Sequence, residues 1–363
     1  MTIECIKIKD LISWVASPAF KRLKVIPISR HRAQSQARNP RAQPDDVALV
    51  LIYDETNLLG YLGILPDQIF YNNQPHRIAW MSCIWVNPKA RGKGVAKQLL
   101  TKGFEVWDNQ LLATEFTAPA KSLYDKMELF DDLHQSEGLR AYLRMDLAYL
   151  LPKKNPKYRS FRFAFRLFDV LFNAVNDIRW WFYRSDQSST IYFVDRVDDA
   201  IAEFIESKQK DELFQRNKKE LNWILQNPWL SDSAEAKEDA TRYHFSSYEK
   251  EAEFVNLKME EEGQVVAYAM LLRRGSTLKV SYLYADAKSL KQITAAIIDY
   301  MRKERLSILT VYHQSLVDYL KENRRPFFLM RPFERSYLIA KKRHQNWGKG
   351  GVIQDGDGDV AFT

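Results

Sequence analysis

The chain has 363 residues, of which 46% are hydrophobic and 28% are charged, and its formal net charge at pH 7 is +8. This composition is typical of folded globular proteins and excludes a disordered or low-complexity chain, and at ~150 residues per domain the length predicts two domains. The excess of basic residues favours an anionic partner but does not choose among a nucleotide, a nucleic acid and a membrane surface.

Cysteine and histidine usage gives no sign of secretion or of a metal centre. Cys5 and Cys83 are too few for a disulfide framework, and we interpret both as buried free thiols. The histidines are scattered without ligand spacing, so we predict no metal. The first ten residues lack the apolar block of a secretion signal, and no stretch approaches the ~18 apolar residues of a spanning helix. We therefore expect a cytoplasmic protein.

Apolar periodicity in the first half predicts strands that alternate with helices. In chain order we expect a strand at 4–9, helices to about residue 35, strands near 48–53, 60–65 and 77–86, a helix at 93–107, a strand at 111–116, a helix around 120–127 and two closing strands up to about residue 149.

The second half repeats this order. We expect a strand at 190–194, a helix at 199–208, strands near 254–259, 265–272 and 277–285, a helix at 289–303, a strand at 307–312, a helix at 315–322, and strands at 327–331 and 336–341. The related sequences Ser122-Leu123-Tyr124-Asp125 and Ser315-Leu316-Val317-Asp318 fall on corresponding helices of the two halves. The fold class predicted is mixed α/β, with one α/β unit used twice.

A basic amphipathic segment, residues 153–184, separates the two halves. One set of apolar side chains recurs at helical spacing and predicts a single helix: Phe161, Phe165, Phe168, Phe172 and Val175. We favour a connector whose apolar stripe packs between the two domains. The alternative is peripheral membrane contact through residues 157–184, anchored by Trp180, Trp181 and Phe182.

The most informative segment is a predicted strand, turn and helix over residues 86–100, with the sequence Val-Asn-Pro-Lys-Ala-Arg-Gly-Lys-Gly-Val-Ala-Lys-Gln-Leu-Leu. Such a junction directs free backbone N–H groups and the positive end of a helix dipole at one place, which suits a phosphate or diphosphate. Gly92 and Gly94 let the anion approach the backbone, and positive charge is added by Lys89, Arg91, Lys93 and Lys97. The spacing matches neither the nucleoside-triphosphate loop nor the dinucleotide fingerprint.

The pattern Val-x-Pro-x-x-Arg-Gly-x-Gly-Val-Ala-x-x-Leu-Leu resembles the acetyl-CoA-binding motif of the GNAT superfamily of N-acetyltransferases. The resemblance implies that acetyl-CoA, or another acyl-CoA, is a co-substrate, and that an acceptor amine attacks its thioester directly. It implies a diphosphate-binding turn made of Arg91, Gly92, Lys93, Gly94, Val95 and Ala96. It also implies that the pantetheine arm is hydrogen-bonded by the backbone of the preceding strand, at Ile84, Trp85 and Val86.

The segment Ala120-Lys121-Ser122-Leu123-Tyr124-Asp125-Lys126 is similar to the family's Ala-x-x-Leu-Tyr-x-Lys. The resemblance implies that Tyr124 protonates the departing thiolate, although its spacing alone is equally typical of a core aromatic residue. The strand at 77–86 has no carboxylate where many family members place a glutamate, so no general base is predicted. Two further departures, Thr117-Ala118-Pro119 and Glu128-Leu129-Phe130, bear on the acceptor side of the site.

The second half has the family's order of elements without its motif. Asp286 stands where a phosphate would bind, and Val317 stands where the first half has Tyr124. In the tail, aspartates alternate with glycines after residue 354, but the terminal glutamate and the flanking helices of a calcium loop are missing, so we expect a flexible tail.

These interpretations give two tandem GNAT-like domains. The ranges are a catalytic domain at 1–150, a helical connector at 151–188, a degenerate copy at 189–345 and a tail at 346–363. We expect an acyltransferase that acts on a small-molecule or peptide amine, without DNA. The alternatives are a non-catalytic acyl-CoA-binding scaffold and a FemABX-like aminoacyl transferase, whose domains lack this coenzyme A turn.

Overall fold

The computed structural model describes residues 1–181, 190–341 and 351–362. The chain forms two compact units, and each unit contains separate segments of the sequence. Unit 1 comprises residues 1–136, 196–252 and 335–363, and unit 2 comprises residues 137–195 and 253–334.

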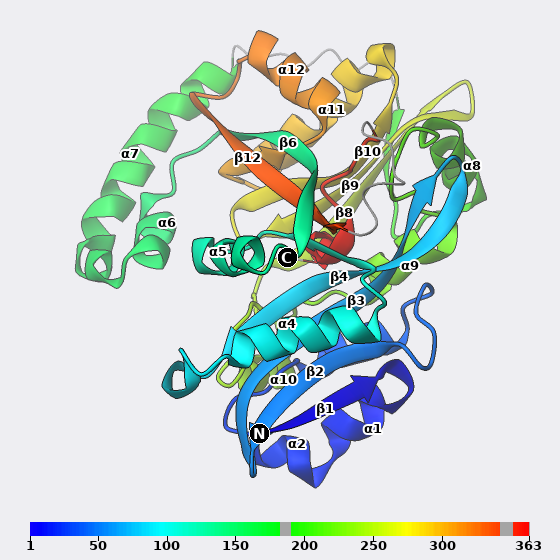
Figure 1. Ribbon diagram of the computed structural model, residues 1–363. Helices are drawn as coiled ribbons and strands as arrows, with labels where there is room; N and C mark the ends of the chain where they lie inside the picture. Colours follow the sequence, from blue (N-terminus) through cyan, green and yellow to red (C-terminus); the bar gives the residue numbers. More distant parts are fainter. Residues whose placement is uncertain (182–189, 342–350, 363) are drawn as a thin grey trace. The chain divides into compact units, whose positions relative to one another are not determined.

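The elements of unit 1 surround a sheet that is mostly antiparallel (Figure 1). Its own strands are β1 (Thr2–Lys7), β2 (Val47–Asp54), β3 (Asn57–Tyr71), β4 (Gln74–Val86) and β5 (Leu111–Thr114). Its helices are α1 (Leu11–Ala16), α2 (Pro18–Arg22), α3 (Arg30–Ala37), α4 (Val95–Val106), α5 (Ala118–Lys126), α8 (Asp199–Lys208), α9 (Lys218–Gln226) and α10 (Ala234–Asp239). Short 3-10 turns are η1 (Ile8–Asp10), η2 (Pro88–Ala90) and η4 (Gly358–Phe362).

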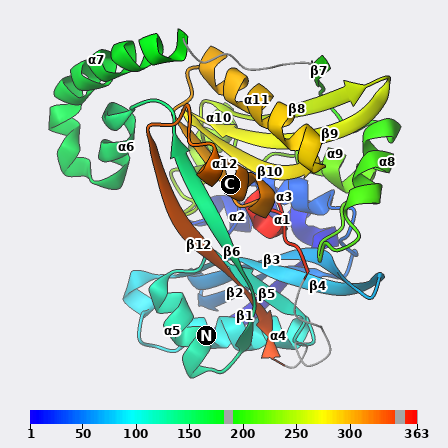
Figure 2. The ribbon, with the colours of Figure 1, turned by 90° about the horizontal axis from the view of Figure 1, so that it is seen from above.

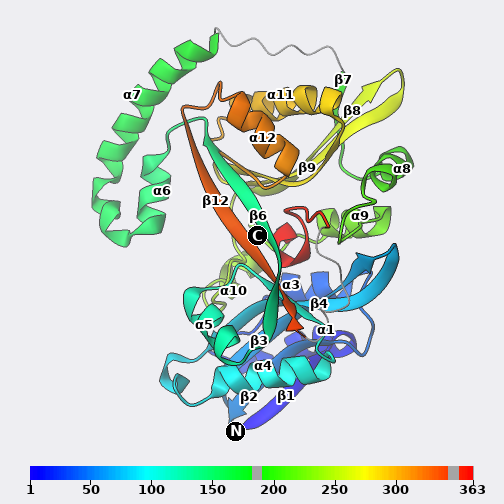
Figure 3. The ribbon, with the colours of Figure 1, turned by 45° about the horizontal axis from the view of Figure 1, so that its top comes forward.

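Unit 2 has the same kind of architecture, with helices on a mixed sheet (Figure 3). Its own strands are β7 (Thr190–Phe193), β8 (Ala252–Glu261), β9 (Gln264–Arg274), β10 (Thr277–Ala285) and β11 (Ile308–Val311). Its helices are α6 (Leu147–Lys154), η3 (Pro156–Phe161), α7 (Arg162–Trp181), α11 (Ala287–Lys303) and α12 (Gln314–Glu322). Two long strands, β6 (Phe130–Tyr142) and β12 (Leu329–Ala340), begin in one unit and end in the other.

The strand order in unit 1 is β1-β2-β3-β4-β5-β12. Neighbours from β1 to β4 are antiparallel, β4 and β5 are parallel, and β12 is antiparallel to β5. Because strand side chains alternate between faces, β2 contributes Val50 and Ile52 to the core under α4 and Leu49 and Leu51 to the core under α1 to α3. The helix α4 lies across β2, β3 and β4 on one face of this sheet (Figure 1).

The strand order in unit 2 is β6-β11-β10-β9-β8-β7, with β10 and β11 parallel. The helix α11 packs on β9 and β10 and contacts α12 (Figure 2). Its buried side chains Ile293, Ile297 and Met301 recur every four residues, which is the spacing of one helix face.

Each unit contains a strand from the other half of the sequence. Tyr337 to Ile339 of β12, near the end of the chain, pair with Thr114 to Leu112 of β5 in unit 1. Leu139 to Tyr142 of β6, from the first half, pair with Val311 to Ile308 of β11 in unit 2. The parallel strand that closes each unit is therefore flanked by a strand from the other half of the sequence.

The sequence expectation of a mixed α/β fold is confirmed, and two details of it are wrong. The two closing strands expected up to residue 149 are one strand, β6, followed by the helix α6. The separate strands expected at 327–331 and 336–341 are the single strand β12, whose first half is mostly exposed and so shows an interrupted apolar pattern.

The helix expected in the connector is present as α7, but its apolar stripe is not packed. Phe161, Phe168 and Val175 are 60%, 50% and 64% exposed, whereas Phe165 and Phe172 are half-buried. The preference for a packed stripe was therefore wrong at these three positions. None of the helices in the described part of the chain is both long and apolar enough to cross a membrane.

Candidate functional site

The predicted cofactor site lies in unit 1, where β4 separates from β5. The parallel pairing of β4 with β5 consists of Ala79 with Leu111, Trp80 with Leu112 and Met81 with Ala113. Within the described residues, Ser82 to Val86 have no strand partner on this side, although Cys83 to Val86 stay paired with β3 on the other. Strand backbone groups that lack a neighbour are available to an extended ligand.

The three residues predicted to contact pantetheine occupy this unpaired part of β4. Ile84 and Val86 are half-buried and pack against the core under α4. Trp85 points to the opposite face, where its ring stacks on Tyr61 at 5.5 Å and on His244 at 5.0 Å. Their side chains are thus occupied by packing, and the backbone is the part that remains for a ligand.

The strand β4 leads through η2 and a turn into the N-terminus of α4. Gly94 is the N-cap residue of α4, has the left-handed backbone angle φ 77°, and provides no side-chain cap. The first helical bond runs from the N–H of Gln98 to the carbonyl of Gly94. The N–H groups of Val95, Ala96 and Lys97 therefore have no acceptor within the helix.

The glycines of the turn leave open space in front of these N–H groups. Gly92 has φ 80°, and a Cβ atom placed on Gly92 or on Gly94 would have no neighbour within 4 Å. Arg91 and Lys93 are exposed beside them and form no ion pair within the part of the chain that the structure describes. The arrangement combines free donors, positive charge and room, and it fits an anionic group such as a diphosphate.

Tyr124 lies on α5, which follows β5. Thr117 caps this helix by accepting a hydrogen bond from the N–H of Ala120, and a proline occupies the first turn. The Tyr124 ring is 4% exposed and packs against Phe116 and Phe130. Burial raises the pKa of its phenol to about 12, so the phenol is protonated at neutral pH.

The C-terminal segment supplies a carboxylate that the sequence interpretation missed. Asp359, on η4, accepts a hydrogen bond at 2.7 Å from the hydroxyl of Ser82, the first β4 residue beyond the β5 pairing. The same hydroxyl accepts a hydrogen bond from Arg32 of α3. Burial raises the pKa of Asp359 to about 6, although the hydrogen bond from Ser82 and the charge of Arg32 both lower it.

Residues 351–362 are built into unit 1, so the expectation of a flexible tail is wrong for them. Asp355 pairs with Arg335, and Asp357 pairs with Arg216. Gly358 has φ 75°, and a Cβ atom there would lie 2.8 Å from the Trp80 ring of β4. In the Asp-Gly repeat, two aspartates therefore form ion pairs and one glycine lies close to β4.

Neither acidic nor thiol alternatives near the site provide a better base or nucleophile. Glu115, which follows β5, is half exposed and pairs with Arg335 at 2.5 Å. Cys83 is a buried free thiol, as expected, and its sulfur lies 3.6 Å from the hydroxyl of Tyr243. Cys5 is only half-buried, contrary to expectation. Within the described residues, no group of three His, Cys, Asp or Glu side chains is arranged to hold a metal.

The corresponding junction in unit 2 is closed by the protein itself. The carboxylate of Asp286, the N-cap of α11, accepts a hydrogen bond at 2.9 Å from the N–H of Ser289. A carboxylate thus occupies the position that is open at α4. Two features of β10 resemble β4: it pairs with β11 through Thr277 to Lys279, and Ser281 interrupts its pairing with β9 as Ser82 interrupts that of β4 with β3. The interruption follows the parallel pairing directly in β4 and one residue later in β10.

Comparison with known proteins identifies this arrangement of sheet, turn and helix. Residues 10–128 match the family model for the acetyltransferase (GNAT) family, and no match was found among curated proteins. The matched residues include β4, the turn and α4, and members of this family use acetyl-CoA.

Solved structures are similar to this chain at low sequence identity. A conserved protein of unknown function from Enterococcus faecalis V583, described as a probable N-acyltransferase, has 11% identity and a TM-score of 0.53 over 94% of this chain and 73% of that chain. A GCN5-related N-acetyltransferase from Anabaena variabilis ATCC 29413 has 12% identity and a TM-score of 0.49, over 81% of this chain and 62% of that chain. A GCN5-related N-acetyltransferase from Kribbella flavida has 10% identity and a TM-score of 0.47, over 93% of this chain and 71% of that chain. At these identities the likeness to the Enterococcus protein concerns the fold alone.

Proposed function

We propose that unit 1 is an acyltransferase that moves an acetyl or other acyl group from coenzyme A to an amine acceptor. The observation that carries this proposal is the separation of β4 from β5 after Met81, directly before an uncapped helix N-terminus with two left-handed glycines. The unpaired backbone of β4 suits an extended arm, and the free N–H groups of α4 suit a diphosphate. Both features belong to one strand, turn and helix, as one elongated cofactor requires.

The direction of the cofactor follows from this arrangement. If the diphosphate binds at Arg91 to Ala96, the pantetheine arm runs back along Val86, Trp85 and Ile84 toward the point where β4 and β5 meet. The thioester end then comes to Ser82, whose hydroxyl is hydrogen-bonded to Asp359. When bound, acyl-CoA supplies an activated acyl group at this point.

Two residues of unit 1 are suited to move the protons of the reaction. The carboxylate of Asp359 can accept a proton from the acceptor amine, because its pKa of about 6 leaves it ionised at neutral pH. The phenol of Tyr124 can donate a proton to the departing thiolate, because it is itself protonated at neutral pH. Asp359 thus takes the role for which the sequence of β4 offers no carboxylate.

We infer further that unit 2 is a second copy of the same fold that has lost the cofactor site. The short parallel pairing of β10 with β11, and the interruption at Ser281, support a common origin with β4 and β5. Asp286 would repel a phosphate and already uses the N–H of Ser289. We therefore expect one cofactor per chain.

Calorimetric titration with acetyl-CoA and with free CoA tests the proposal. We expect micromolar binding of both by the wild type and loss of binding in Gly94→Glu, whose carboxylate would occupy the phosphate position. The matched control is Gly263→Glu, because Gly263 has φ 78° and equally open surroundings but lies in the turn between β8 and β9. The control carries the same backbone strain and should bind normally. Absence of binding by the folded wild type, or equal loss in both variants, would contradict the proposal.

A further inference from the structure

The helix α7 is docked on unit 2 through its polar side. The carboxylate of Asp169 accepts hydrogen bonds at 2.9 Å from the N–H groups of Leu147 and Ala148, which begin α6. The side chain of Asn173 bonds to the N–H of Met145 at 2.9 Å and to its carbonyl at 2.8 Å. Polar groups of α7 thus satisfy the backbone of the segment on which the helix rests.

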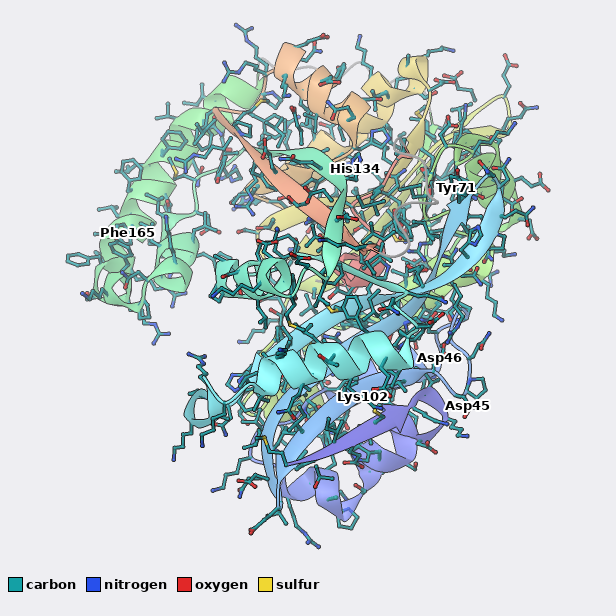
Figure 4. The ribbon with its side chains drawn as sticks, viewed as in Figure 1. Asp45, Asp46, Tyr71, Lys102, His134 and Phe165 are labelled. Carbon is teal, nitrogen blue, oxygen red and sulfur yellow. The ribbon has the colours of Figure 1, made fainter. Side chains whose placement is uncertain are left out.

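The opposite side of α7 is apolar and exposed. Six side chains that are between 55% and 82% exposed form what we call the exposed face of α7: Phe163, Leu167, Val170, Leu171, Val175 and Ile178. A surface helix of a globular protein normally buries its apolar stripe, so the orientation of α7 is inverted. Phe165, whose ring packs near Tyr158 and Phe161 of η3, is half-buried (Figure 4).

The segment that carries the exposed face is rich in positive charge. Five basic side chains of α6, η3 and the first turns of α7 are exposed: Lys154, Lys157, Arg159, Arg162 and Arg166. Between residues 154 and 178 the acidic side chains are Asp169, which is buried, and Asp177, which pairs with Arg144. The segment from residue 154 to residue 178 therefore has more exposed basic than acidic side chains.

We propose that the exposed face of α7 binds an anionic lipid bilayer. An apolar helix face bordered by arginine and lysine lies in the plane of a membrane surface, where the apolar side chains enter the acyl region and the basic ones meet lipid phosphates. A second copy of the chain fits less well, because a two-fold contact through this face would bring the same basic residues together. The helix rests on the membrane and does not cross it, in agreement with the absence of a spanning helix among the described residues. Of the aromatic anchors that the sequence suggested, the side chains of Trp180 and Trp181 and all of Phe182 lie outside the described residues.

Flotation with lipid vesicles tests this inference. The full chain is mixed with vesicles of phosphatidylcholine alone and with vesicles that contain phosphatidylglycerol, and the bound fraction is measured. We expect binding to the anionic vesicles and at least a roughly tenfold weaker partition in the double variant Leu167→Gln, Leu171→Gln. The matched control replaces Ile3 and Ile12, which are 40% and 44% exposed, with glutamine and should bind as the wild type does.

A second variant separates the contribution of charge from that of apolar burial. In Arg162→Glu, Arg166→Glu we expect the preference for anionic over neutral vesicles to fall at least roughly tenfold, because each basic residue contributes about 1 kcal/mol near such a surface. Thermal unfolding should be unchanged in both variants, since the substituted side chains are exposed. No flotation of the wild type, or flotation that the α7 variants do not reduce, would overturn the proposal. So would a lipid-independent dimer that Leu167→Gln, Leu171→Gln dissociates.

Discussion

A conservative substitution of Tyr124 distinguishes a packing role of its ring from a catalytic role of its phenol. Its ring is buried among Phe116 and Phe130, and a phenylalanine would keep that packing. If the phenol protonates the thiolate, Tyr124→Phe should lower the rate of CoA release by about 10²-fold or more, with unchanged acetyl-CoA affinity and unchanged thermal unfolding. The measurement is chromatography of CoA during turnover with an amine acceptor found by screening. An unchanged rate would leave Tyr124 as a core aromatic residue.

From the raised pKa of Asp359 we expect the reaction rate to depend on pH. A general base must be ionised, and burial places the pKa of Asp359 at about 6, so kcat/KM should rise with pH up to about 6 and then level off. Because this pKa lies above the ordinary value, ionisation opposes folding, and the stability that this group contributes falls as pH rises from ~4 to ~6. In Asp359→Asn we expect a rate loss of about 10²-fold and disappearance of the limb near pH 6, because the amide still accepts the hydrogen bond from Ser82 but takes up no proton. The same limb in the variant would assign it to another group.

Among the individual residues of the candidate site, the sequence allows the diphosphate-binding candidates to be predicted but not Asp359. The candidate residues for diphosphate binding are consecutive, and their conformation depends on local features such as the glycines at 92 and 94. Asp359 could not be found in this way, because its position near Ser82 depends on how a segment 277 residues away folds back. The signal available was the Asp-Gly repeat, whose carboxylates are too regularly spaced for an ordinary linker.

At the scale of elements, α4 and α11 begin in opposite ways. The first turn of α4 has free N–H groups, whereas Asp286 caps α11. We expect Asp286→Ala to lower the free energy of unfolding by about 1 kcal/mol, as removal of an N-cap usually does. Acetyl-CoA affinity should stay unchanged. Urea denaturation and calorimetric titration of the same preparation measure both quantities, and a change in affinity would show that α11 takes part in cofactor binding.

Most elements could be predicted because their apolar periodicity is local, and the exceptions have tertiary causes. The helix α6 begins where it does because Asp169, far along the chain, accepts hydrogen bonds from its first N–H groups. The periodicity of α7 predicts a helix with an apolar side, but it does not say which side is docked. Here Asp169 and Asn173 decide the orientation by bonding to the backbone of residues 145–148.

For the molecule as a whole, each unit contains a strand from the other half of the sequence, so the folding of each unit depends on distant parts of the chain. Unit 1 needs β12 beside β5, and it needs Arg216 beside the buried Asp67. A fragment of residues 1–150 lacks both, and it also lacks Glu220, so Asp67 loses one of its two arginine partners and Arg41 loses one of its two carboxylate partners. We therefore expect this fragment to show no cooperative thermal transition by circular dichroism, while the full chain does. A cooperative transition in the fragment would mean that residues 196–252 and 335–363 are dispensable for the core.

A crystal structure of the full chain grown with CoA tests the proposed site most directly. We expect one CoA per chain, in unit 1, with its diphosphate on the N–H groups between Gly92 and Lys97 and its pantetheine arm along Ile84 to Val86. Its sulfur should be the end closest to Ser82. A diphosphate bound at α11, or an arm that runs away from Ser82, would contradict the proposed site.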